Sequence, residues 1–294
     1  MNQPANMFNP RLPRRRLVAG LFAGVFLTIT LVGVAVLAVL ILSVAREGWS
    51  WLSVKFLTNP PSRLWPENAG LKSALFGTLW LTGITIVVTI PIGVGGAVYL
   101  EEFARDNRLT RLIRLNIANL AGVPSVVYGI LGLAVFVRWL RFDRSVLSGG
   151  LTLSLLVLPV VIIASREALA AVPSSIRNAA YALGATKWQT VRAHVLPAAL
   201  PGIITGVILA LSRAVGETAP LIMLGGLTFC TAVPDGPLSD FTAMPIQIYN
   251  WLDEPQPEFH HLAAAGIIVM LGVLLSMNAL AIGIRAWKQR RRLW

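Results

Sequence analysis

The stretch that decides the fold reads REALAAVPSSIRNAAYALGATKWQTVRAHVLP at residues 166–197 and continues as AALPGIITGVILALSRAVGETAPLIML at residues 198–224. The first part is polar and basic, which is typical of a helical hairpin at a membrane surface. The second part is a long apolar run with one arginine and one glutamate, which is typical of a membrane-spanning helix. We therefore expect a surface element joined directly to a charged span, so that movement outside the bilayer reaches a polar path inside it.

The composition of the whole chain is that of a polytopic membrane protein. Of its 294 residues, 55% are hydrophobic and 13% are charged, and the mean hydropathy is +0.70. A soluble domain would have about a quarter of its residues charged. Apolar blocks long enough to cross a bilayer recur along the sequence, so we predict an all-α fold with six membrane-spanning helices. The expected spans are residues 17–45, 73–100, 115–137, 149–165, 198–225 and 262–284.

The distribution of positive charge predicts the orientation. Basic residues lie in short segments beside the apolar blocks, as in cytoplasmic loops, which argues against a nucleic-acid partner. With both termini in the cytoplasm, the inner segments hold more than twice as many Lys and Arg as the outer ones, although the outer loop at 138–148 is basic. The expected divisions are a cytoplasmic segment at 1–16, the first span at 17–45, a core with five further spans at 73–284, and a cytoplasmic tail at 285–294.

The residues that usually carry catalysis or bind metals are scarce. Cys230 is the only cysteine, so an intrachain disulfide is excluded. The three histidines, His194, His260 and His261, show no metal-ligand spacing. An intramembrane enzyme would need a catalytic constellation in the spans, and they hold no histidine and no repeated acidic pair. We therefore expect no catalytic residue and no metal site.

The segment at 166–197 predicts two short helices. The first covers residues 174–183 after Pro173, with Ser174 or Ser175 as its cap, and Gly184 is placed to end it. The second covers residues 186–195 and leads into Leu196 and Pro197. Physical reasoning alone leaves two interpretations equally open, a compact cytoplasmic knob that contacts a partner or an ordinary interfacial loop.

This segment resembles the EAA loop of ABC importer permeases. Ala179, Ala180, Gly184, Leu196 and Pro197 match that pattern at the right spacing, whereas Asn178 replaces its usual Glu and His194 its usual Ile. In that family the loop forms coupling helices that dock in a groove of a cytoplasmic ATPase subunit. The resemblance implies this role for residues 174–188 and for the wider set Asn178, Ala179, Ala180, Gly184, Ala185, Lys187, Leu196 and Pro197.

Most of the chain is similar to the PstA family of phosphate permease subunits. The similarity is sharpest in AAYALGATKW, SRAVGETAPLIML, GVPSVVYGILGL (122–133) and MPIQIYNW (244–251), and the last of these favours PstA over the sister PstC type. The resemblance implies a type I ABC importer permease in a bacterial inner membrane that translocates inorganic phosphate. Its implied partners are a PstB-type ATPase dimer, a PstC-type sister permease, an external phosphate-binding protein and the lipid bilayer.

The chain has no phosphate-binding loop of the Walker type, so ATP must be hydrolysed by another chain. We accordingly expect no cofactor on this chain and no enzyme activity of its own. The alternatives are a permease for another oxyanion such as sulfate or molybdate, a PstC-type subunit, a membrane scaffold without transport, and an intramembrane enzyme.

Arg213 and Glu217 are the candidate residues of the substrate path. They are four residues apart in an apolar run, so they lie on one face of a helix. An ionised group in a bilayer costs about 2.5–3.5 kcal/mol on insertion scales, so such residues usually have a function, although a purely structural ion pair is the alternative. The resemblance implies a role in phosphate translocation for both. Arg166 and Glu167 form a weaker candidate pair, which would anchor its helix at the interface.

Overall fold

The computed structural model describes residues 12–225 and 230–290, and in this part of the chain the regular elements are all helices. An isolated bridge between Ser145 and Asp240 is the closest approach to sheet pairing within it. The all-α prediction is therefore confirmed. Residues 1–11 of the expected N-terminal segment and residues 291–294 of the expected basic tail lie outside the described residues.

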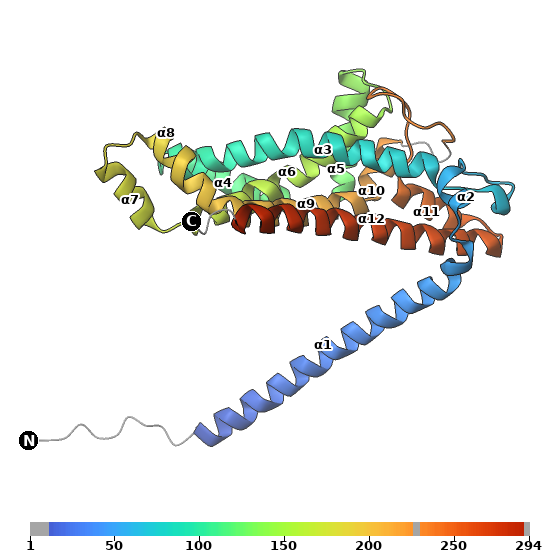
Figure 1. Cartoon of the computed structure of the whole chain (residues 1–294), viewed down its shortest axis with the longest axis horizontal. Coiled ribbons are helices and arrows are strands. Elements are labelled where there is room, and N and C mark those ends of the chain that lie inside the picture. The colour runs from blue at the N-terminus through green and yellow to red at the C-terminus, as the bar shows by residue number, and fades with distance from the viewer. Residues whose placement is uncertain (1–11, 226–229, 291–294) are drawn as a thin grey trace, which may run out of the picture.

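Five helices of the described chain are long and apolar enough to cross a membrane, and a bent pair provides a sixth crossing if it counts as one span. Figure 1 shows most of them running roughly alongside one another. The long helices are α1 (Leu12–Gly48), α3 (Lys72–Val98), α6 (Val146–Ala170), α9 (Leu196–Gly216) and α12 (Pro257–Arg290).

The expected third span at 115–137 is wrong in shape. Helix α4 (Arg108–Ala121) and the following α5 (Ser125–Gly132) with η4 (Leu133–Trp139) meet at an angle of 101°. The break falls before Pro124, whose ring removes a donor and disfavours helical backbone at the preceding residue. Arginines recur along α4, so α4 is an amphipathic helix and the apolar part of this crossing is α5 with η4.

The expected fifth span at 198–225 is also interrupted. Helix α9 ends at Gly216, Glu217 has extended backbone (φ −76°, ψ 118°), and a separate short helix α10 (Ala219–Leu224) follows. Pro220 has no backbone N–H to donate to the carbonyl of Gly216, and its ring would clash with that carbonyl in a continuous helix, so the helix breaks before it. The break therefore lies directly beside the charged pair predicted for the substrate path.

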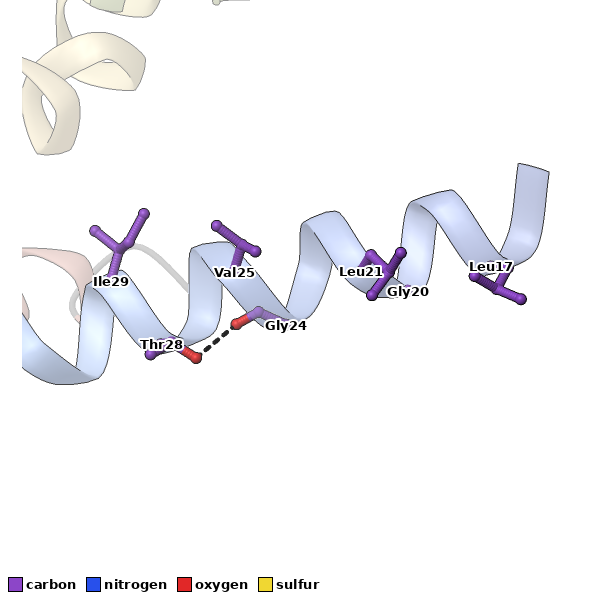
Figure 2. Close-up of a pocket in the computed structure, with 7 residues that line it drawn as sticks. All are labelled: Leu17, Gly20, Leu21, Gly24, Val25, Thr28 and Ile29. Atoms are coloured by element: carbon purple, nitrogen blue, oxygen red, sulfur yellow. Dashed lines mark hydrogen bonds between the residues drawn. The ribbon is translucent and has the colours of Figure 1, made fainter. Parts of the chain in front are cut away.

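Helix α1 stands apart from the other helices (Figure 1). It contacts α12 only near its end, where a Cβ added to Gly48 would lie 2.5 Å from the backbone nitrogen of Ala265. Farther along, Gly20, Gly24 and Thr28 form the floor of a shallow groove on α1 itself (Figure 2). Small residues of this spacing allow another helix to approach closely in a membrane.

The packed centre is formed by α3, α6 and α9. Small residues let their backbones approach: a Cβ added to Gly93 of α3 would lie 2.7 Å from Val161 of α6, and one added to Gly206 of α9 would lie 2.4 Å from Ala164. This packing surrounds a buried apolar cluster. Its members include Val157, Val161, Leu169, Val195, Ile203 and Ala210.

The shorter elements lie at the two ends of the bundle. One end carries η1 (Trp49–Trp51), α2 (Val54–Thr58), η2 (Pro66–Asn68) and α11 (Met244–Asp253). The opposite end carries η3 (Tyr99–Phe103), α7 (Ser174–Ala182), α8 (Lys187–Thr190) and η5 (Val191–Val195). The start of α1 and the end of α12 lie toward this second end, which we call the inner end (Figure 1).

Gly77 and Gly83 of α3 provide a matched test of the packing. A Cβ at Gly77 would lie 1.9 Å from the carbonyl oxygen of Thr242, whereas one at Gly83 would meet nothing within 4 Å. Because backbone cannot rotate away as a side chain can, Gly77→Ala should destabilise the fold by about 1–3 kcal/mol. Thermal unfolding of the purified protein in detergent should show a lower Tm for Gly77→Ala and an unchanged or slightly higher Tm for Gly83→Ala, because Ala favours a helix more than Gly does. Equal Tm values for the two variants would contradict the packing.

Candidate functional site

The segment at 166–197 folds as the two short helices that its sequence predicts. Helix α7 ends before Gly184, and α8 and η5 follow it. The predicted serine cap is wrong, because Pro173 occupies the N-cap position and Ser174 is already helical. Pro173 fits there, since its fixed φ suits a helix start and its missing donor is not needed.

The turn between α7 and α8 is fixed by backbone hydrogen bonds. Gly184 has a φ of 81°, a left-handed conformation that glycine adopts without strain. The backbone N–H of Ala185 donates to the carbonyl of Ala180 at 3.1 Å, and that of Gly184 donates to Tyr181 at 2.9 Å. This pair of bonds is a Schellman motif. A capping box between Thr186 and Gln189 then starts α8, so the hinge is a defined structure.

The surface of α7 and α8 exposes apolar side chains at the inner end. Leu183 is 89% exposed and Trp188 is 58% exposed. Asn178 and Ala179 are exposed as well, whereas Ala180 is buried. Large exposed apolar side chains on one small element are typical of a surface that another protein covers.

The second half of the hairpin is continuous with a membrane span. Helices α8, η5 and α9 together form a candidate span of 30 residues from Lys187 to Gly216. Leu196 and Pro197 are half-buried at the start of α9, where the missing donor of proline is tolerated. The chain is therefore helical from Lys187 to Gly216, and Arg213 lies near the far end of this segment.

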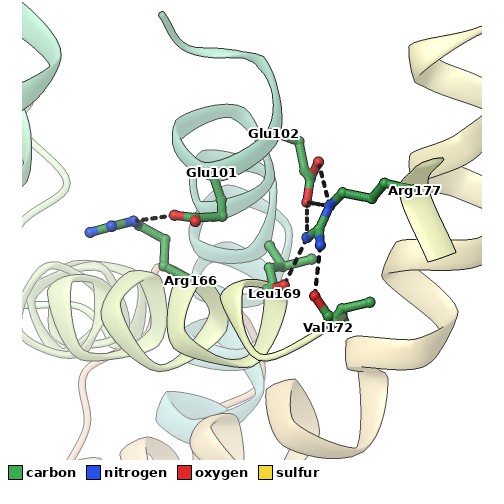
Figure 3. Close-up of polar contacts among 6 residues, drawn as sticks. All are labelled: Glu101, Glu102, Arg166, Leu169, Val172 and Arg177. Atoms are coloured by element: carbon green, nitrogen blue, oxygen red, sulfur yellow. Dashed lines mark hydrogen bonds and ion pairs between the residues drawn. The ribbon is translucent and has the colours of Figure 1, made fainter. Parts of the chain in front are cut away.

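Three ion pairs among the described residues lie at the inner end or on α9, and the most buried of them was not predicted. Glu102, in η3, has a side chain only 5% exposed and pairs with Arg177 of α7 (Figure 3). Arg177 donates from Nη2 and Nε to Glu102 Oε1 at 2.6 and 3.1 Å. It also donates to the carbonyls of Leu169 and Val172 at the end of α6, at 2.9 and 2.7 Å. One guanidinium thus ties three segments together.

A neighbouring ion pair replaces the predicted pairing of Arg166 with Glu167. Arg166 Nε lies 3.3 Å from Glu101 Oε2, and both side chains are about a quarter exposed (Figure 3). Glu167 is exposed on α6. Adjacent residues of a helix point in directions about 100° apart, so Arg166 and Glu167 cannot both face α3.

The pair on α9 is formed as predicted. Arg213 Nε donates to Glu217 Oε1 at 3.1 Å. The arginine side chain is 56% exposed, whereas that of Glu217 is 16% exposed. The arginine therefore faces away from the packed helices, and the glutamate, in the break between α9 and α10, holds its Nε edge.

Two further polar contacts connect α9 with α12. Ser212 donates to Asn278 Oδ1 at 2.6 Å, and Arg285 Nη1 donates to Thr205 Oγ1 at 2.7 Å. Neither Asn278 nor Thr205 was among the predicted site residues, although an amide inside a predicted span was a detectable signal. These bonds hold α12 against the helix that carries Arg213.

The remaining reactive side chains lie apart from these sites. Within residues 12–225 and 230–290, no three His, Cys, Asp or Glu side chains come close enough to hold a metal ion. Cys230 is buried, and the ring of His261 stacks on Trp51 at 6.3 Å. In the basic loop before α6, Arg141 and Asp143 have positive φ values, and Arg144 lies against Gly225.

Residues 89–292 match the family described as binding-protein-dependent transport system inner membrane component. The phosphate transport system permease protein PstA 1 of Mycobacterium tuberculosis (strain ATCC 25618 / H37Rv) is 33% identical over 297 residues, covering 99% of this chain and 96% of its own. The phosphate transport system permease protein PstA of Yersinia pestis is 33% identical over 248 residues, covering 83% and 80%. The probable ABC transporter permease protein YqgI of Bacillus subtilis (strain 168) is 36% identical over 214 residues, covering 73% and 72%.

Solved structures share the fold. A bacterial alginate ABC transporter in complex with an alginate-bound periplasmic protein aligns with a TM-score of 0.65 and 16% identity, over 92% of this chain and 96% of that one. The inward-facing MetNI methionine ABC transporter aligns with a TM-score of 0.59 and 17% identity, over 74% and 94%. The helical arrangement is that of a type I ABC importer permease.

Substitutions at Gly184 test the hinge between α7 and α8. A side chain at a φ of 81° costs about 1–2 kcal/mol for most residues and less for asparagine. Gly184→Ala should therefore open the turn, and Gly184→Asn should have a smaller effect. Amide hydrogen exchange at positions 184 and 185 should be fastest for Ala, intermediate for Asn and slowest for the wild type. Slower exchange in Gly184→Ala than in Gly184→Asn would refute the left-handed hinge.

Proposed function

The chain belongs to the family of binding-protein-dependent transport system inner membrane components, and from this premise we propose that it forms the path for inorganic phosphate in an ATP-driven importer. It is a membrane-embedded permease subunit of such a system. Members of this family work with an ATPase and a substrate-binding protein. The proposal adds the substrate, the residues on its path and the residues that couple it to ATP hydrolysis.

The choice of phosphate is supported by the extent of the similarity to phosphate permeases. Two relatives named as PstA proteins match 99% and 83% of the chain at 33% identity. The first of these matches extends over nearly the whole chain and not only the family core. The alginate and methionine transporters support the shared fold only, so they carry no argument about the substrate.

The single observation that carries the proposed path is the exposure of Arg213 inside an apolar span. A guanidinium in contact with lipid tails costs about 2.5–3.5 kcal/mol on insertion scales, so its exposed face must meet water or protein. The planar fork of arginine binds tetrahedral oxyanions through parallel hydrogen bonds. Within the described part of the chain, Arg213 donates a hydrogen bond from Nε to Glu217, so both of its terminal nitrogens are available to an anion.

The coupling role of residues 174–188 is supported by their shape and their position. Exposed Leu183 and Trp188 suit a groove on the ATPase, and the turn at Gly184 fixes α7 relative to α8. In our proposal, closure of the ATPase dimer displaces this loop. The continuous helix from Lys187 to Gly216 carries that displacement to Arg213. Asn178 replaces the usual glutamate of the EAA motif, so the proposed contact with the ATPase lacks a negative charge at residue 178.

The remaining partners follow from the surfaces that the monomer leaves open. We assign the exposed face of Arg213 and the groove of α1 (Figure 2) to the interface with a PstC-type sister permease. A PstB-type ATPase dimer docks at the inner end, and a phosphate-binding protein docks at the opposite end. The start of α1 and the end of α12 lie on the side of α7 and α8, which supports a bacterial inner membrane topology with both termini in the cytoplasm (Figure 1).

ATP-driven phosphate uptake in vesicles containing the reconstituted complex tests the proposed path. A hydrogen bond to a charged group contributes about 1.5–3 kcal/mol, so Arg213→Gln should lower the rate of uptake by about 10- to 100-fold. Arg213→Lys keeps the charge and loses the planar fork, so it should lie between the two. The matched control is Arg46→Gln, which removes an exposed arginine from the end of α1 and should leave uptake unchanged.

Three outcomes separate the alternatives. Normal uptake by an assembled Arg213→Gln complex would make the pair with Glu217 purely structural. Uptake of sulfate or molybdate in place of phosphate by the wild-type complex would refute the substrate and retain the permease. If the assembled wild-type complex transports no oxyanion, that result would favour a membrane scaffold without transport.

A further inference from the structure

Four successive residues of η3 each contact a different segment of the inner end. The carbonyl of Leu100 accepts a hydrogen bond from Arg114 of α4 at 2.7 Å, and Glu101 pairs with Arg166 of α6. Glu102 pairs with Arg177 of α7. Phe103 contacts α8. The ammonium of Lys187 lies over the Phe103 ring, 5.4 Å from its centroid, and the ring of Trp188 lies 6.4 Å from it, centroid to centroid.

The local backbone explains why these neighbours can diverge in direction. Residues Tyr99–Phe103 form a π-helical turn at the end of α3, and Ala104 then leaves in extended conformation (φ −65°, ψ 138°). A π turn changes the angular spacing of consecutive side chains relative to an α-helix, and such turns often mark functional positions. Here the turn directs two carboxylates to two different helices, as Figure 3 shows.

The contact with α7 differs from the others in burial and in number of bonds. The side chain of Glu102 is 5% exposed and that of Glu101 is 23% exposed. Helix α7 itself buries only Ala180, with Ile176 partly buried against the core cluster. Apart from its covalent connections and the packing of Ile176, α7 is therefore tied to α3 and to the end of α6 by the hydrogen bonds of Arg177.

We propose that Glu102 is a positioning residue for energy coupling, through which displacement of α7 is transmitted by Arg177 to α3. This inference rests on the proposed function, since it assumes that α7 docks on the ATPase. It adds a second route beside the covalent one from α8 to α9. With both routes intact, α3, α6 and α9 move as one body when the ATPase pulls on the hairpin. With the Glu102 contact broken, the pull on α7 reaches α3 only indirectly, through α6 and α9.

The transmission from α7 to α3 depends on the fixed geometry and the burial of the contact between Glu102 and Arg177. Arg177 donates from Nη2 to Oε1 at 2.6 Å and from Nε to Oε2 at 3.4 Å of Glu102, and such a two-point contact has one favourable relative orientation, which a hydrophobic contact lacks. Burial keeps water from replacing either partner, and breaking the pair would leave an uncompensated charge. The link therefore resists both shear and separation. The pair between Glu101 and Arg166 joins α3 to α6 without touching α7, so it serves as an internal comparison.

The test uses the complete reconstituted complex and measures phosphate imported per ATP hydrolysed. Glu102→Gln should still assemble with its ATPase and hydrolyse ATP, while phosphate imported per ATP falls by about tenfold, within the usual range of coupling between sites. Glu101→Gln, which removes the adjacent carboxylate, should change this ratio by less than about twofold. A wild-type ratio in Glu102→Gln would overturn the inference, and so would equal losses in both variants. Failure of the wild-type complex to import phosphate would instead refute the proposed function.

A second set of variants keeps the inference testable if Glu102→Gln does not assemble. Arg177→Lys retains the charge but cannot contact Glu102 and both α6 carbonyls at once, so it should also lower phosphate imported per ATP. In a Cys230→Ser background, Glu102→Cys with Arg177→Cys allows a short bifunctional thiol reagent to join α3 to α7 covalently. The cross-link should restore the ratio that the two substitutions lower. Normal coupling in Arg177→Lys, or no recovery on cross-linking, would overturn the transmission route.

Discussion

The constraint on which the structure depends is that a charge at or inside the bilayer must be matched by a fixed partner. Arg177 meets it with a buried carboxylate and two carbonyls, and so fastens a surface helix to the spans. Arg213 meets it only in part, because Glu217 holds one edge of its guanidinium and the rest is exposed. The first arrangement is complete within the chain, and the second requires a partner or an anion.

Helix interruptions decide where these charges act. Proline breaks the expected spans at Pro124 and near Pro220, and the π turn of η3 changes the direction of side chains at the end of α3. Each break frees backbone groups that an intact helix would satisfy, which membranes tolerate only where protein or water replaces them. Two of these interruptions, at Glu217 and in η3, carry ion pairs, whereas the uninterrupted parts of α3, α6 and α9 supply the packing.

Transport requires some contacts to hold and others to change. In the described bundle, glycines such as Gly93 and Gly206 let α3 and α9 each approach the side chains of α6 closely, which leaves little room for movement of either helix against α6. The hairpin, in contrast, exposes Leu183 and is attached mainly by polar bonds. A rigid bundle with a firmly attached hairpin suits a subunit that rotates as one body, because displacement of the hairpin then moves the whole bundle and does not only deform the chain between them.

The sequence by itself determined the helical membrane class, the two-helix hairpin with its turn at Gly184 and the pairing of Arg213 with Glu217, because hydropathy, capping and i,i+4 spacing are local properties. Only the tertiary structure decided that the third crossing bends by 101°, that Arg166 pairs with Glu101, and that Glu102 reaches Arg177. The last two residues are 75 positions apart. Their meeting depends on how α3 and α6 pack, and on a π turn that no local pattern in the sequence announced.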